Sequence, residues 1–234
     1  MQIDLHVHSS FSDGKNTPLE MVVSAIELGY EAIAFTDHVW KYSTWLDEYI
    51  TEISRLKQLF SSQIKVYCGV EAKVTDLLGS IDFDEAYYGE LDFVLAAFHR
   101  IPLGNNIYAN SLAVSSMPEY FLEKWLLAFE GALQNPFVDG IAHPFNLQQA
   151  FLDAWGIETE IRLLEIILKH NKIVEYNVKY PCALLSDFWS APGLRISPSS
   201  DSHSKCELTE RSKLIKALES FFIEHRKPLF PLRS

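Results

Sequence analysis

The sequence has few cysteines, no long apolar run and a deficit of positive charge. Its 234 residues include three cysteines, Cys68, Cys182 and Cys206, which are too scattered for a disulfide framework and form no C-x-x-C pair. We therefore expect free thiols. Only Cys206 remains a candidate for a further ligand, because it lies three residues beyond His203 in sequence.

Apolar segments are short throughout the chain. None approaches the roughly 20 residues that cross a bilayer, and residues 1–8 lack the basic start and apolar run of a signal peptide. We expect no membrane segment and a cytoplasmic location.

Basic residues are outnumbered, with 20 Lys and Arg against 31 Asp and Glu, for a formal net charge of -11. This balance argues against broad binding of nucleic-acid backbone. It is compatible with a small phosphorylated substrate, because bound divalent cations would offset acidic ligands inside a cleft. Nothing in the sequence indicates an oligomeric state.

Short apolar runs alternate with helical patterns, which is typical of βαβ units in a parallel sheet or barrel. Helices are predicted from Thr17-Pro18 to Gly29, where Glu20 completes a capping box with Thr17, and at 44–61, 118–133, 158–170 and 207–225. Residues 82–90 predict a short helix, and 100–116 a long loop without regular structure. We expect one domain over residues 1–234, with seven strands at 2–7, 31–36, 65–74, 92–99, 137–142, 172–177 and 194–197.

Metal-ligand side chains follow the ends of most of these strands. Because the carboxyl ends of barrel strands share one rim, side chains dispersed in sequence would meet there. The sequence therefore predicts a metalloenzyme. The residues concerned are His6, His8, Asp37, His38, Glu71, His99, His143, Asp201 and His203.

His6-x-His8 is the sharpest local signal, because alternate residues of a strand project to the same side and two imidazoles can then share a cation. Glu71 follows an apolar run, so its carboxylate needs a charged partner or a metal, and bridging two cations would satisfy it. A core Arg or Lys would serve equally.

Other charged residues near the strand ends could be metal ligands or could orient a ligand. In Asp37-His38 and Asp201-x-His203, one member can ligate while the other orients it. Asp4 belongs to such a supporting set or to the strand surface. His170 and His225 lie on predicted helices and are assigned no chemistry.

The ordered set of motifs resembles the polymerase-and-histidinol-phosphatase (PHP) family. The resemblance runs from residue 3 to about residue 204 and implies a distorted seven-stranded, TIM-like α/β barrel that holds two or three divalent metals, such as Zn, Mn or Fe. The motifs that carry it are His6-Val-His8-Ser-Ser-Phe-Ser-Asp13-Gly14, Thr36-Asp37-His38, Gly69-Val-Glu71, Phe98-His99, Ala142-His143-Pro144 and Ser200-Asp201-Ser-His203.

The resemblance also implies three metal sites. His6, His8, Glu71 and Asp201 would surround the first, and Glu71 would bridge to a second held by His99 and His143. Asp13, His38 and His203 would hold the third. Asn177, at the end of the sixth strand, would point at the site.

Such a cluster favours phosphoester hydrolysis by a metal-bridging hydroxide, with Glu71 as the bridging ligand. Asp201, His203 or a metal-bound water would give the leaving alkoxide its proton. Arg100, Lys179 and Arg195, next to strand ends, are predicted to bind the phosphoryl group. The favoured substrate is a phosphomonoester of a small metabolite, similar to histidinol phosphate.

Three other functions fit parts of the pattern. A phosphodiesterase or exonuclease on short nucleotides could use the same cluster. An amidohydrolase also starts with H-x-H, although it usually has eight strands and a bridging Lys that has no counterpart here. A structural module that has lost its ligands is disfavoured because the ligand set is complete.

Overall fold

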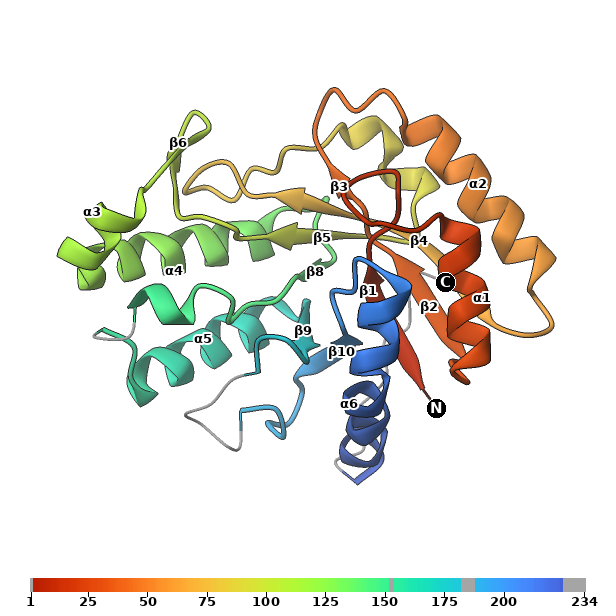
Figure 1. Ribbon diagram of the computed structural model, residues 1–234. Helices are drawn as coiled ribbons and strands as arrows, with labels where there is room; N and C mark the ends of the chain where they lie inside the picture. The colour runs from red at the N-terminus through yellow and green to blue at the C-terminus, as the bar shows by residue number, and fades with distance from the viewer. Residues whose placement is uncertain (1, 152–153, 182–187, 225–234) are drawn as a thin grey trace.

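Seven parallel strands form a nearly closed barrel (Figure 1), as predicted. The computed structural model describes residues 2–151, 154–181 and 188–224. The last strand returns to the first just beyond their carboxyl ends, where Val7 bridges to Ser202 and the Asp201 N–H donates to the His6 carbonyl at 3.0 Å. In spatial order the strands are β1 (Ile3–Val7), β2 (Ala32–Phe35), β4 (Lys65–Lys73), β5 (Phe93–Ala97), β8 (Gly140–Ile141), β9 (Ile173–Asn177) and β10 (Arg195–Ser199).

Helices cover the outer side of the barrel (Figure 1). The predicted capping box starts α1: Thr17 Oγ1 accepts from the Glu20 N–H at 3.3 Å, and Glu20 Oε2 accepts from the Thr17 N–H at 2.9 Å. The predicted short helix is the 3-10 helix η1 (Glu85–Glu90). The main helices are α1 (Pro18–Glu27), α2 (Leu46–Leu59), α4 (Pro118–Gln134), α5 (Ile157–His170) and α6 (Lys205–Glu224).

A shift in the pairing of β1 with β2 sets the direction of the first two histidines. Leu5 packs inside the barrel with Leu95, whereas Val7 packs in the outer core. The register shifts between Asp4 and Val7, and such an irregularity changes the face that a side chain takes. His6 and His8, on either side of Val7, therefore point to the inside of the rim.

The expectation of an unstructured loop at 100–116 is wrong. The segment forms a hairpin of β6 (Pro102–Gly104) and β7 (Ile107–Tyr108), followed by α3 (Ser111–Ser116). Asn105 and Asn106 join the strands with φ of 51° and 59°, the left-handed backbone that a tight hairpin turn requires and that Asn tolerates. The Asn-Asn pair was the available signal.

Three smaller differences concern the other connections. The two-residue strand β3 (His38–Val39) pairs with β4 beyond the end of β2. The strand predicted at 137–142 shortens to β8, and the 3-10 helix η2 (Gln148–Phe151) follows it. Cys182 and His225 lie outside the described residues. The assignment of residues 1–234 to a single domain stays a prediction.

Among the helices that the structure describes, none combines the length and the apolar composition needed to cross a membrane.

A close backbone contact joins the loop after β4 to α4, and it predicts a stability effect. A Cβ at Gly79, whose φ is +79°, would lie 2.0 Å from the backbone of Gly131 and Ala132. We expect Gly79→Ala to lower the free energy of unfolding by about 3 kcal/mol or more, because steric overlap adds to the left-handed strain. Urea denaturation measures this. Gly89→Ala is the control, since nothing lies within 4 Å of its Cβ position; equal effects would contradict the contact.

Candidate metal centre

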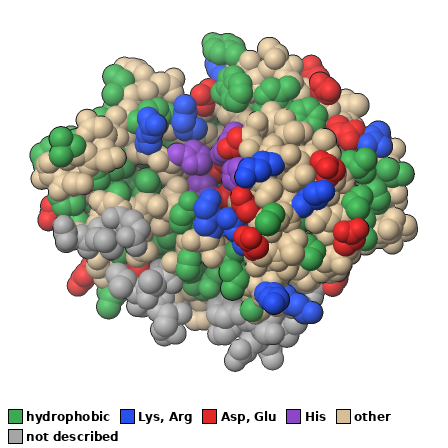
Figure 2. Space-filling view, viewed as in Figure 1, with side chains coloured by type: hydrophobic (Ala, Val, Ile, Leu, Met, Phe, Trp, Pro, Cys, Tyr) green, Lys and Arg blue, Asp and Glu red, His purple; other side chains and the backbone are tan. Residues whose placement is uncertain are grey.

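The predicted ligand residues gather at the carboxyl-terminal rim of the barrel. His6 and His8 come from β1 and the residue after it, Glu71 from β4, and Asp201 from the turn after β10. The histidine side chains lie in a hollow surrounded by Lys and Arg side chains (Figure 2). His99 and His143 follow β5 and β8.

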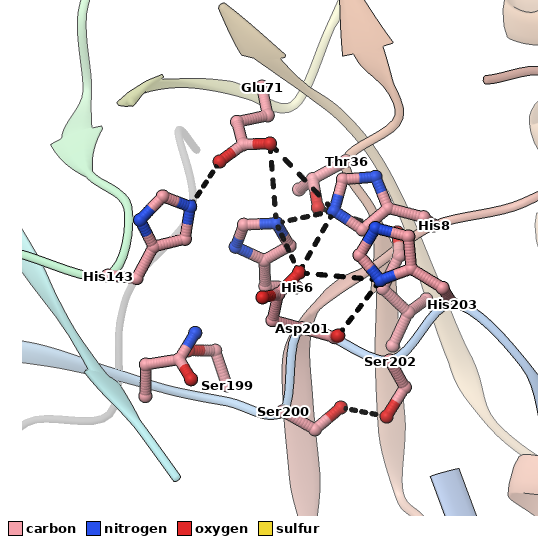
Figure 3. A network of polar contacts seen from close by, with 12 residues as sticks. His6, His8, Thr36, Glu71, His143, Ser199, Ser200, Asp201, Ser202 and His203 are labelled. Carbon is pink, nitrogen blue, oxygen red and sulfur yellow. Dashed lines mark hydrogen bonds and ion pairs between the residues drawn. The ribbon is translucent and has the colours of Figure 1, made fainter. Parts of the chain in front are cut away.

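Glu71 is 1% exposed, and its carboxylate faces the rings of His143, His6 and His8 (Figure 3). Its Oε1 is 2.7 Å from His143 Nε2, and its Oε2 is 2.7 Å from His38 Nδ1. Oε2 also lies 3.7–3.8 Å from a nitrogen of each of three other imidazoles. These three imidazoles belong to His6, His8 and His99. Five histidines therefore take the place of the alternative partner, a core Arg or Lys.

Three groups of side chains bring their ligand atoms within 4.8 Å of one another. The groups share Glu71, His8 and His38, so they form one continuous cluster. Asp201 Oδ1 lies 3.3 Å from His8 Nε2 and 3.9 Å from His6 Nε2, next to the second group. The groups are His8, Asp13, His38 and His203; His6, His8 and Glu71; and His38, Glu71 and His99.

The spacing of the donor atoms fits divalent cations. His6 Nε2 and His8 Nε2 are 2.9 Å apart, with both rings buried. Zn–N bonds of about 2.0–2.1 Å place two nitrogens on one ion roughly 2.9–3.4 Å apart. Because Glu175 accepts from His6 Nδ1, the His6 Nε2 lone pair points at His8 when the His6 ring is neutral. A divalent cation bound by both nitrogens would accept this lone pair and that of His8 Nε2.

The charges in the cluster shift the pKa of Glu71 and of its neighbouring imidazoles in different directions. Burial by itself raises the pKa of Glu71, but the charges of His6 and His143 hold it well below its usual range. Burial lowers the pKa of His6, yet the carboxylates of Glu175 and Glu71 raise it to about 10. Partial desolvation lowers the pKa of His99, whose side chain stays 41% exposed, and this favours the neutral imidazole, the form that binds metals.

Two cluster residues hold strained backbone. His143 has a φ of 28° and Asp201 a φ of 54°, both in the left-handed region that residues other than Gly rarely adopt. Such strain costs of order 1–3 kcal/mol per residue and persists where the surroundings enforce it. This backbone turns the His143 side chain toward Glu71 and the Asp201 side chain toward His8.

Asp37 organises the loop that carries Asp13. Its Oδ1 accepts from the backbone N–H groups of Ser9 and Ser12 at 2.8 and 3.1 Å. The Ser12 hydroxyl also donates to Oδ1, and the Ser9 hydroxyl donates to Oδ2. Of the Asp37-His38 pair, His38 therefore faces the cluster and Asp37 orients the loop. In the second pair, both Asp201 and His203 face the cluster.

Asp4 supports the rim and does not lie on the strand surface. It is fully buried and accepts from the Ser200 N–H at 3.0 Å and the His6 N–H at 3.3 Å. Burial raises the pKa of Asp4 to about 6 against these hydrogen bonds. Cys206 is exposed, donates to Glu210 and belongs to none of the three groups.

Glu175 is the site residue that sequence reasoning missed. It is fully buried on β9, accepts from His6 Nδ1 at 2.6 Å, and accepts from the His143 N–H at 2.8 Å. It thereby orients the His6 ring and stabilises the strained backbone of His143. The signal was available, since Glu175 lies in an apolar strand two residues before Asn177.

The residues predicted to bind substrate divide into two sets. Lys179 Nζ donates to Asp201 Oδ2 at 2.9 Å, and Asn177 is buried with its Oδ1 accepting from the Lys179 N–H. Arg100 follows His99 on the exposed rim. The placement of Arg195 on the rim is wrong: it starts β10, at the opposite end of the strand, and donates to the Asn171 carbonyl at 3.0 Å.

Comparison with known proteins finds chains of similar sequence and similar fold. A sequence model of the family described as PHP domain matches residues 4–179. A probable phosphatase of Acetivibrio thermocellus is 30% identical over 229 residues, covering 93% of this chain and 86% of that protein. The DNA polymerase/3′-5′ exonuclease PolX of Bacillus subtilis is 31% identical over 183 residues, covering 74% of this chain but 28% of the polymerase.

The fold is shared with a solved enzyme. The histidinol phosphate phosphatase of Lactococcus lactis subsp. lactis, solved with zinc, L-histidinol and phosphate, superposes with a TM-score of 0.62 at 24% identity. The match covers 92% of this chain and 93% of that one. It establishes the barrel topology.

Removal of central ligands should lower the metal content. We expect Glu71→Ala and His143→Ala to lose at least one bound metal per chain, because Glu71 belongs to two of the groups and His143 contacts Glu71 at 2.7 Å. Elemental analysis of the purified variants measures this. His170→Ala is the control, since His170 contacts Glu130 on the helical side. Metal content equal to wild type in either cluster variant would contradict the assignment.

Glu175→Gln should weaken metal binding although it changes no direct ligand. Loss of a carboxylate behind a metal-binding imidazole typically costs about 10–100-fold in affinity. Titration against a chelating dye measures this. Glu165→Gln, at an exposed position on α5, is the matched control. If Glu175→Gln binds metal like the control, Glu175 does not position His6.

Proposed function

The chain belongs to the PHP domain family, and on that premise we propose that it is a metal-dependent phosphatase that hydrolyses phosphomonoesters of a small metabolite. It is a hydrolase of phosphate esters; the substrate and the metals are the parts that we propose. The observation that carries the proposal is the convergence of three potential metal-binding groups on Glu71 and its neighbours.

We propose that two or three divalent cations, zinc, manganese or iron, occupy these groups. When bound, they supply Lewis-acid polarisation of phosphoryl oxygens and an activated water nucleophile. His6, His8, Glu71 and Asp201 would hold one cation, with His99 and His143 joining Glu71 at a second. Asp13, His38 and His203 would hold the third, which is the most exposed of the three groups.

Lys179 supplies positive charge next to the cluster. Burial lowers the pKa of its ammonium, but the adjacent Asp201 carboxylate raises it above its usual value, so the group stays protonated. It is placed to neutralise a phosphoryl oxygen while it holds Asp201. Asn177 fixes the turn that carries Lys179. Arg100 would add a second positively charged side chain from the exposed rim.

With two cations bound and no third, His203, beside Asp201, would give the leaving alkoxide its proton. His203 Nδ1 lies 3.1 Å from the Asp201 carbonyl, and its Nε2 lies 3.4 Å from Asp13 Oδ1. His203 is partly exposed, so it can exchange protons with solvent more readily than buried His6 or His8. An imidazole placed in this way can give a proton to a leaving group.

Two observations support a small substrate over a polymer. The net charge of -11 disfavours a long phosphate backbone, and the cavity beside the cluster has a volume of about 250 Å³, below the 300–1,000 Å³ of typical drug-sized sites. A histidinol-phosphate-like monoester fits both. Diester cleavage of short nucleotides is the rival, favoured by the similarity to the exonuclease-containing polymerase.

The monoester proposal predicts a clear substrate preference. We expect the metal-loaded protein to hydrolyse p-nitrophenyl phosphate with a higher kcat/KM than bis(p-nitrophenyl) phosphate. The bound metals and the nearby basic side chains attract the doubly charged monoester more strongly than the singly charged diester. Release of p-nitrophenolate measures both rates. Glu71→Ala should abolish turnover, with His170→Ala as the control. Preference for the bis-ester would replace the phosphatase by a phosphodiesterase.

A further inference from the structure

The cavity of about 250 Å³ next to the cluster has a second set of wall residues with no metal-binding role. Three of its wall residues belong to the cluster: His38, Glu71 and His99. Four others do not: Val39, Trp40, Lys73 and Asp82. A ligand that reaches the cluster through this cavity would therefore contact an indole, an ammonium and a carboxylate.

Lys73 is the cation of this second set. It ends β4, two residues after Glu71, so both side chains project to the same side of the strand. Its Nζ lies 3.5 Å from Asp82 Oδ2, longer than the roughly 2.7–2.9 Å of a charge-assisted hydrogen bond. The ammonium therefore retains N–H groups for an acceptor on a ligand.

The side chain of Lys73 is held in place by the β6–β7 hairpin. Its Nζ lies 5.3 Å from the centre of the Tyr108 ring, a cation–π contact. The Tyr108 hydroxyl donates to the carbonyl of Val74, the next residue after Lys73, at 3.2 Å. The hairpin therefore fixes the position of the cation at the cavity wall.

Asp82 is already engaged by the protein. Its Oδ1 accepts from the Lys41 N–H at 3.0 Å, and its Oδ2 faces Lys73. These contacts hold the segment after β3, which carries Trp40. A cationic ligand would have to compete for this carboxylate, so the cavity favours an anionic or acceptor group at Lys73.

Trp40 offers an aromatic surface at the cavity. It is 47% exposed, and its ring meets the Trp45 ring edge-on at 6.3 Å, which restricts its orientation. Planar rings pack favourably against an aromatic side chain and remove its apolar surface from water. The volume of about 250 Å³ is roughly that of eight water molecules at about 30 Å³ each, room for a single ring with a substituent.

We propose that this cavity binds the leaving group of the phosphomonoester, and that this group is a single planar ring carrying an anionic or hydrogen-bond-accepting substituent. The ring contacts Trp40 and the substituent accepts from Lys73. The inference rests on the proposed phosphatase function, and it adds the chemical class of the alcohol that is released.

The test compares four esters with the metal-loaded protein: phenyl, 4-carboxyphenyl, 4-(aminomethyl)phenyl and glycerol phosphate. The wild type should have its lowest KM for the 4-carboxyphenyl ester. Lys73→Met should raise that KM about tenfold and change the phenyl ester KM by less than about twofold, since it removes one charge-assisted hydrogen bond. Trp40→Leu should raise the KM of all three aryl esters and leave that of glycerol phosphate unchanged.

Two variants control for general effects. Lys57→Met removes a lysine that also pairs with a carboxylate, Asp92, and also lies over a tyrosine ring, at 5.9 Å, but on α2 outside the cavity wall. Tyr42→Leu removes an aromatic that is 81% exposed two residues from Trp40. Both should keep wild-type KM values for all four esters.

A binding measurement makes the test independent of turnover. Quenching of tryptophan fluorescence by 4-carboxyphenylphosphonate should be strong in the wild type and weak in Trp40→Leu. Equal KM increases for every ester in Lys73→Met would overturn the leaving-group role, because Lys73 would then bind the phosphoryl group. An absence of preference among the esters would also overturn it. Failure of the wild type to hydrolyse any ester would instead contradict the proposed phosphatase.

Discussion

The burial of the Glu71 carboxylate constrains the rest of the site. A carboxylate that is 1% exposed loses its hydration, and only nearby positive charge can offset that loss. Five imidazoles from β1, β3 and the segments after β1, β5 and β8 lie within 3.8 Å of its oxygens. The same arrangement that stabilises the carboxylate brings the ligand atoms close enough to share cations, so fold stability and metal binding have one physical origin.

Around this centre, carboxylates with no direct place in the metal groups hold the ligands in position. Glu175 orients His6 and the backbone of His143, and Asp37 holds the Ser9–Ser12 turn through four hydrogen bonds. The left-handed backbone of His143 is held by the bond from its N–H to Glu175, and that of Asp201 by the bond from its N–H to the His6 carbonyl. The barrel supplies the scaffold, and buried acids supply the accuracy that coordination demands.

The metal cluster and the cavity wall have different origins in the chain. Cluster residues lie at strand ends, whose positions follow from the barrel itself. Trp40 and Asp82 lie on connecting segments, and the cation Lys73 is oriented by a hairpin that the barrel does not require. Loops on such a rim can vary while the strands stay in place, so the reaction and the choice of substrate reside in separate parts of the structure.

Local sequence patterns determined much of this protein: seven strands, the capping box at Thr17, and strand ends at which Glu71 and its histidines lie. The family resemblance implied that the strands close into a barrel. The local patterns could not reveal the register shift that turns His6 and His8 inward, because Ile3, Leu5 and Val7 read as one uninterrupted alternation. They also misplaced Arg195, because this residue lies near the amino end of its strand, whereas the rim is formed by the carboxyl ends. The contact of Glu175 with His6 joins residues 169 positions apart. Only the closed tertiary structure decides such contacts, because they depend on which side chains face each other across the barrel.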